Sequence, residues 1–233
     1  MKRASLTIPI ILLLCFCAYA QSQPDRGVVH DGVYTSADFG FTFKYPKDWV
    51  VHGEATNERI REIGKEKIAE SGTSRASVEV ALNNTYQLLT VFRYPLGTPG
   101  ITFNPAVLVI AERVSHAPGI ITGKDYLLNV RTILTKTGYQ PQFKEPVEYH
   151  FAGTQFFRDN YAVEINGLHM VQAHFATVKN GYALIFAFMG ADETSVDEMA
   201  KSMETFDVTL PSVRRGVTTV IGSAPQDKPA PKP

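Results

Sequence analysis

Cysteine is nearly absent from this 233-residue chain, and the two that exist stand close to its start. Cys15 and Cys17 both lie in a segment, residues 1–20, that is typical of a leader. A chain without that segment has no thiol. It therefore forms no disulfide, uses no cysteine nucleophile and builds no thiolate metal site.

An excess of charge of either sign is also absent. The 23 basic and 23 acidic residues balance, and loss of Lys2 and Arg3 with the leader takes the basic count to 21, a net charge of −2. Proteins that bind nucleic acid neutralise phosphates with a surplus of lysine and arginine. The composition therefore excludes nucleic acid as the expected partner.

Motifs that carry known chemistry are missing as well. The chain has no Gly-x-Ser-x-Gly and no Walker-type glycine loop. Its histidines show no His-x-His or His-x-x-x-His spacing, and His169 and His174 differ in parity along one expected strand, so they point to opposite faces. We therefore expect no metal site, no cofactor and no catalytic residue that a motif would reveal.

The first twenty residues have the three parts of a secretory signal. Lys2 and Arg3 form a basic end, Ile8–Cys17 is an apolar run too short to span a bilayer, and Ala18-Tyr19-Ala20 supplies small residues for cleavage. We expect a signal peptide over residues 1–20, cut after Ala20. The protein would then be secreted or periplasmic, with no transmembrane segment after cleavage.

Composition divides the remainder into three parts. Residues 21–32 are polar and are predicted to be a flexible lead-in, and residues 33–210 carry the apolar patterning of one globular domain. Residues 211–233 are rich in proline, alanine and lysine, and bury too little to offset the entropy of ordering. They are predicted to be a disordered tail.

Hydrophobic periodicity predicts a domain dominated by strands. Strands 32–35 and 41–45 form an opening hairpin, and Trp49 is expected to fill one end of the core. A helix over 122–136 begins with Thr122 and Asp125 at capping-box spacing. Its predicted buried stripe is Tyr126, Val130, Ile133 and Leu134, and the other expected elements are a surface helix over 56–70 and strands over 87–94 and 106–114.

Two Asn-Gly pairs, at 166–167 and 180–181, predict tight hairpin turns. They join strands 154–165, 168–178 and 182–189 into a meander whose two faces are both apolar, so helices must cover both sides. The last helix, 194–206, opens at Thr194 with Asp197 and supplies one cover. The predicted fold is α+β, an antiparallel β-sheet covered by helices on both faces, an α/β/α sandwich.

Three stretches of this sequence resemble the PsbP-like domain family, which includes extrinsic photosystem II subunits and exported bacterial relatives. The segment 40–49, with Phe43-Lys44-Tyr45-Pro46-Lys47-Asp48-Trp49, resembles the family's Phe-x-Tyr-Pro-x-x-Trp start. The turn at 180–184 resembles its late hairpin, and Glu204-Thr205-Phe206 resembles its terminal helix, with threonine where serine is frequent. The resemblance implies the sandwich fold and a non-enzymatic role in binding or assembly.

The turn register also places two carboxylates opposite histidines. Asp159 faces His174 across the hairpin, and Glu164 faces His169 beside the turn. A carboxylate beside an imidazole can raise its pKa and orient it for proton transfer. The same geometry also makes an ordinary cross-strand pair, so both interpretations of Asp159 and His174 stay open.

The segment 95–105 is a loop between two strands that carries Ile101 and Phe103. Long loops that present apolar residues are often binding surfaces. The alternative is that Phe103 folds back onto the core as a lid. A weak binding site at Ile101 and Phe103 is therefore the second candidate.

Two hypotheses of function follow. The first is an exported, non-enzymatic binding or assembly module of PsbP-like type, whose partner is a protein or small molecule of the envelope. The second is a hydrolase or transferase with dispersed catalytic residues that include Asp159 and His174. Clustering of these two side chains with a further polar group in a deep pocket would favour the enzyme.

The leader generates the first testable prediction. N-terminal sequencing of the exported protein from its native host should begin at Gln21. A mature protein that begins at Met1 would contradict export by cleavage.

Overall fold

The structure is a computed structural model that describes residues 23–59, 61–62, 83–136, 140–165 and 167–208. The predicted signal peptide, the predicted tail and most of the predicted helix over 56–70 lie outside these residues. Residues 54–59 and 61–62, at the start of that helix, are helical. No helix in the described ranges is long and apolar enough to cross a membrane.

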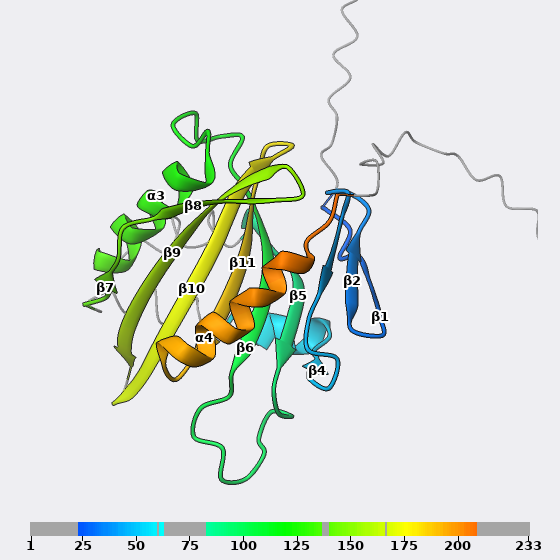
Figure 1. The fold of residues 1–233 in the computed structure, drawn as a ribbon, viewed down its shortest axis with the longest axis vertical. Helices are drawn as coiled ribbons and strands as arrows, with labels where there is room; N and C mark the ends of the chain where they lie inside the picture. The colour runs from blue at the N-terminus through cyan, green and yellow to red at the C-terminus, as the bar shows by residue number, and fades with distance from the viewer. Residues whose placement is uncertain (1–22, 60, 63–82, 137–139, 166, 209–233) are drawn as a thin grey trace, which may run out of the picture.

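The described strands form two antiparallel sheets (Figure 1). The larger has the order β4-β5-β6-β11-β10-β9-β7, with β8 also paired to β9, and the smaller has the order β1-β2-β3. The strands of the larger sheet are β4 Val50–Val51, β5 Thr85–Phe92, β6 Ala106–Arg113, β7 Gln142–Phe143, β8 Val147–Phe151, β9 Thr154–Ile165, β10 Leu168–Lys179 and β11 Tyr182–Gly190. Those of the smaller are β1 Val28–His30, β2 Val33–Ser36 and β3 Phe41–Lys44.

The predicted meander of β9, β10 and β11 is confirmed, including its register. Asn180 and Gly181 have φ values of 54° and 80°, as the turn between β10 and β11 requires. Ala176 pairs with Ile185 and Phe175 with Phe186, on opposite faces of the sheet. Because the turns set these pairs locally, the sequence was sufficient to predict them.

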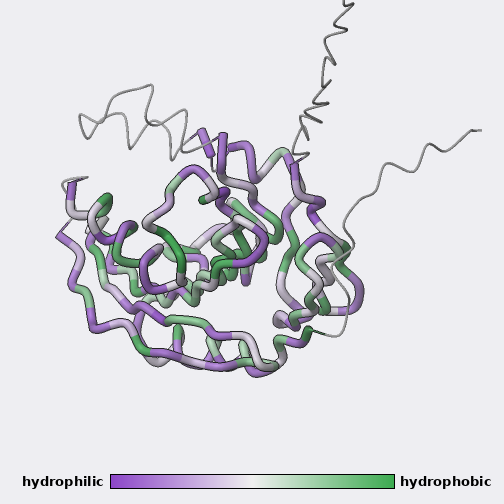
Figure 2. Tube along the Cα trace, turned by 90° about the horizontal axis from the view of Figure 1, so that it is seen from above, coloured by the Kyte–Doolittle hydropathy of each residue, from purple (hydrophilic) through white to green (hydrophobic). Residues whose placement is uncertain are grey.

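Apolar clusters lie on both faces of the large sheet, and a helix covers each. Helix α3 (Gly123–Lys136) packs Tyr126 and Leu127 on one face, and helix α4 (Glu193–Ala200) packs Val196 and Met199 on the other. The hydrophobic stretches of the trace gather in the interior (Figure 2). The predicted sandwich is therefore confirmed.

The α4 face is covered by more than a helix. The small sheet also packs there, with the rings of Phe41 and Phe43 at 5.5 and 5.2 Å from that of Phe186. Phe206, which follows the 3₁₀ turn Lys201–Thr205, stacks on Phe41 at 5.3 Å. The opening hairpin thus forms a layer of the core. The sequence predicted the pairing of its two strands but not their packing on the large sheet.

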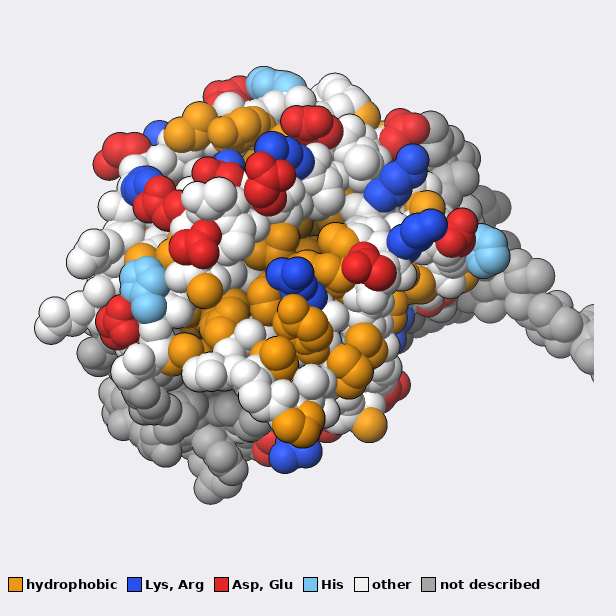
Figure 3. Space-filling model, turned by 60° about the horizontal axis from the view of Figure 1, so that its bottom comes forward, with side chains coloured by type: hydrophobic (Ala, Val, Ile, Leu, Met, Phe, Trp, Pro, Cys, Tyr) orange, Lys and Arg blue, Asp and Glu red, His pale blue; other side chains and the backbone are white. Residues whose placement is uncertain are grey.

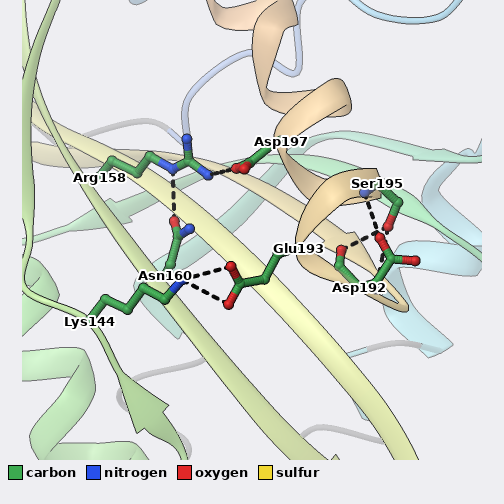
Figure 4. Close-up of polar contacts among 7 residues, drawn as sticks. All are labelled: Lys144, Arg158, Asn160, Asp192, Glu193, Ser195 and Asp197. Carbon is green, nitrogen blue, oxygen red and sulfur yellow. Dashed lines mark hydrogen bonds and ion pairs between the residues drawn. The ribbon is translucent and has the colours of Figure 1, made fainter.

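Polar contacts hold α4 on the sheet (Figure 4). Lys144 Nζ lies 2.7 and 2.8 Å from the two carboxylate oxygens of Glu193, and Arg158 of β9 pairs with Asp197. The helix opens at Asp192, whose carboxylate accepts from the Ser195 amide at 2.7 Å in a capping box. The predicted opening at Thr194 was therefore wrong by two residues, because aspartate outcompetes threonine as a cap.

Four other expectations need correction. Residues 28–30, expected in the flexible lead-in, form β1, and β7 and β8 were missed because they are short or largely exposed. In α3 the predicted Tyr126 is buried, but Leu127 is buried as well and Ile133 is 49% exposed. Trp49 packs against the core but is only partly buried, because it follows a turn at the edge of the sheet.

Helix α3 contacts the backbone of β10 at its first residue, Gly123. A Cβ at this position would stand 1.9 Å from the carbonyl oxygen of Ala176. Backbone cannot move aside as a flexible side chain can, so only glycine allows this contact.

Replacement of Gly123 should therefore destabilise the whole domain. We expect Gly123→Ala to lower the free energy of unfolding by about 1–3 kcal/mol, as overpacked sites do, measured by urea denaturation. Gly119→Ala is the matched control, because a Cβ there meets nothing within 4 Å. Equal stability of the two variants would contradict this packing.

Candidate functional site

The loop between β5 and β6, residues 94–105, is closed at its base by backbone contacts. The Arg93 amide donates to the Pro105 carbonyl at 2.9 Å, next to the last rung of the ladder. The Asn104 side chain then pairs with the Tyr94 backbone in both directions, with distances of 3.0 and 2.8 Å. The side-chain amide thus acts as one further rung.

Two turns shape the end of this loop. The Thr98 amide and hydroxyl both donate to the Pro95 carbonyl, at 3.2 and 2.7 Å, and the Ile101 amide donates to the Thr98 carbonyl at 3.4 Å. Gly97 and Gly100 have positive φ values of 83° and 79°. The loop is therefore a defined structure at the end of two rigid strands.

The β5–β6 loop projects beyond the strands at one end of the molecule (Figure 1) and presents apolar side chains to solvent. Leu96 is 50% and Ile101 37% exposed, and Val51 of nearby β4 is 40% exposed. No charged residue occurs from Tyr94 to Ala111. Figure 3 shows hydrophobic side chains gathered on the face seen from this end, with a lysine or arginine side chain among them and most other charged side chains above them.

Phe103 is partly buried, yet neither it nor Ile101 belongs to the side chains of the described residues that pack against the two apolar clusters. A lid that closed over the core would have to join one of those clusters. Of the two interpretations that the sequence left open, this placement favours a binding surface.

Asp159 and His174 are directly opposite one another, as the register predicted. The side chains nevertheless bond elsewhere. Both carboxylate oxygens of Asp159 accept from Arg131 of α3, each at 2.7 Å, and Asp159 is only 2% exposed. The Arg131 guanidinium also lies 4.8 Å from the Phe143 ring centre and donates to the Lys144 carbonyl.

His174 contacts neutral groups instead. Its Nε2 lies 2.9 Å from Gln172 Oε1 and 3.3 Å from the hydroxyl of Tyr161, which donates to the same Gln172 oxygen at 2.8 Å. Burial lowers the pKa of His174 to about 4. Asp159 and His174 thus bond to different partners, so the acid–base pair that the register allowed does not form in this structure.

The second predicted pair lies at the hairpin end. His169 Nδ1 is 2.6 Å from Glu164 Oε1, and both side chains are more than half exposed. The pair is a surface contact beside the turn, where water screens the charges. Among the described residues no group of three or more histidine, cysteine, aspartate or glutamate side chains is placed to hold a metal ion.

A polar cavity of about 440 Å³ was missed by the sequence analysis. Its walls come from the lead-in, from the helical residues after β4 and from the start of β5. The signal in the sequence was a stripe of polar residues at helical spacing, Glu54, Asn57, Glu58 and Arg61. The segments that complete the walls are distant in sequence, so no local pattern predicted the cavity.

The Arg131–Asp159 pair generates a prediction about stability. Arg131→Met leaves a buried carboxylate without its cation and should lower the free energy of unfolding by about 3–5 kcal/mol, measured by denaturant titration. The double variant Arg131→Met/Asp159→Leu should recover most of this loss, because it removes the unpaired charge. His174→Gln should change the stability by about 1 kcal/mol or less. A larger loss from His174→Gln than from Arg131→Met would contradict the assignment.

No protein-family model and no curated protein matches the chain. Among solved structures it is similar to the cyanobacterial PsbP protein CyanoP of Synechocystis sp. PCC 6803, with a TM-score of 0.43 and 16% identity, over 78% of this chain and 95% of that one. It is also similar to LpqN of Mycobacterium tuberculosis, described as involved in cell envelope biogenesis, with a TM-score of 0.37 and 10% identity, over 72% and 82% of the two chains. A Pseudomonas aeruginosa protein of unknown function has a TM-score of 0.37 and 13% identity, over 57% of this chain and 83% of that one.

All three TM-scores lie below 0.5. The architecture described above therefore rests on this chain's own strand order and packing, and the resemblance to PsbP-like domains stays a prediction from its motifs.

Proposed function

We propose that this protein is an exported, non-enzymatic binding module that contacts a protein partner through the β5–β6 loop. The observation that carries the proposal is the combination of a clamped loop base with exposed apolar residues beyond it. Asn104 fixes the base, and Leu96 and Ile101 are exposed beyond it. A loop ordered before binding loses little entropy when the partner arrives.

The uncharged composition of the loop supports a protein partner. Burial of a charged group at the centre of an interface costs desolvation energy, and charged residues are depleted there. The segment from Tyr94 to Ala111 carries none. An uncharged segment with exposed apolar side chains is typical of the centre of an interface.

The competing hypothesis, a hydrolase or transferase, depends on Asp159 and His174. Its general base would need a carboxylate that orients the imidazole and a substrate within hydrogen-bond reach. In the structure the Asp159 carboxylate is hydrogen-bonded to Arg131, and His174 is hydrogen-bonded to Gln172 and Tyr161. These contacts favour structural roles for both residues.

The proposal predicts where the partner contacts the protein. A photo-crosslinking amino acid at position 101 should capture a specific partner in the native host, and the same group at position 121 should not. Ile121 is the matched control because it is 74% exposed and lies at the start of α3, away from the loop. Equal crosslinking from both positions would contradict the proposal.

Mutation of the same surface provides a further test. Leu96→Ser/Ile101→Ser should reduce partner capture at least about tenfold, since each change removes an apolar side chain that the partner would bury. The melting temperature should stay nearly unchanged, because both side chains are exposed in the free protein. His174→Gln should retain capture. If His174→Gln abolishes the biological activity while the loop variant keeps it, the enzyme hypothesis replaces ours.

A further inference from the structure

The helical residues that follow β4 present one polar face. The Gly53 carbonyl accepts the amides of Thr56 and Asn57, each at 3.2 Å, and starts the helical turn. Glu54, Asn57, Glu58 and Arg61 then recur every three or four residues, a spacing that places them on one side. All four line the cavity of about 440 Å³, and its other walls are Gln23, Pro24, Arg26, Asn83, Thr85, Tyr86 and Gln87.

Two of the four charged side chains in this cavity neutralise each other, and two do not. Arg26 pairs with Glu54. Arg61 donates to the neutral Asn83 side chain at 3.2 Å. Within the described ranges Glu58 has no ion-pair partner and Arg61 has no acidic one. Among the described residues, Glu58 and Arg61 thus have no ion-pair partner, and they stand three positions apart on the helical turn.

Asn57 and Tyr86 complete the wall beside the two charged side chains. The Asn57 side chain is buried, with 7% exposed, and belongs to the helical turn at the start of the cavity. Beside it Tyr86 offers an aromatic surface, held by an edge contact with Tyr182 at 6.2 Å.

We propose that this cavity binds a small zwitterion that carries an ammonium group and a carboxylate, of the amino acid or short peptide class. The ammonium would pair with Glu58, and the carboxylate would bind the Arg61 guanidinium, which suits planar oxygen pairs. The ligand's side chain would lie against Tyr86. The cavity has the size of small-molecule sites, about 300–1,000 Å³.

The test uses the full chain and two panels of probes, the twenty free amino acids and a set of glycyl dipeptides. At millimolar concentration at least one probe should raise the melting temperature, since a ligand that binds only the folded state stabilises it. Calorimetric titration then gives its affinity. The N-acetylated form and the C-terminal amide of the same probe should each bind about ten- to a hundredfold more weakly, because each lacks one charge.

Variants locate the site. Glu58→Gln and Arg61→Gln should each lower the affinity for the probe by about ten- to a hundredfold. The Glu58→Gln variant should also bind the probe and its N-acetyl form equally well. Glu198→Gln is the matched control, since Glu198 pairs with Lys201 on α4 and is exposed. Leu96→Ser/Ile101→Ser should leave probe binding intact, which separates this site from the loop surface. Absence of any shift across both panels, or affinity unchanged in both cavity variants, would overturn the proposal.

Discussion

Burial of strand β11 on both faces is the constraint on which the rest of the structure depends. β11 lies between β6 and β10, with Phe186 and Phe188 in one apolar cluster and Ile185 and Ala187 in the other. A strand of this kind is stable only when both faces are covered. The covers are α3 on one side, and α4 with the small sheet on the other.

The same constraint explains why the polar residues between α3 and the sheet have structural roles. Polar groups enclosed by such a cover need partners, because unsatisfied ones are costly. Arg131 meets Asp159, and His174 meets Gln172 and Tyr161. The covering layers do not enclose the β5–β6 loop, since it extends past the ends of the strands (Figure 1). A rigid sheet with an apolar loop at one end is suited to hold a partner.

The sequence predicted what local signals determine and missed what depends on distant segments. The Asn-Gly turns fixed the register, and with it the opposition of Asp159 and His174. The partner of the Asp159 carboxylate depends on Arg131, 28 positions earlier. It lies on a helix whose predicted buried stripe was right for Tyr126 and Val130 but included the exposed Ile133 and missed Leu127. The polar cavity joins three separate segments, so its lining could not be predicted from one stripe.

Our central claim, that the α3 face of β9 and β10 is structural and not catalytic, depends on the protonation of one side chain. The most direct measurement is an NMR titration of the His174 ring, with His174→Gln used to assign its signal. Because the ring is partly buried and bonds to neutral groups, the account predicts a pKa of about 4, well below the ordinary value of 6.5. A pKa at or above 6.5 would show that the Asp159 carboxylate acts on the imidazole, and would contradict the account.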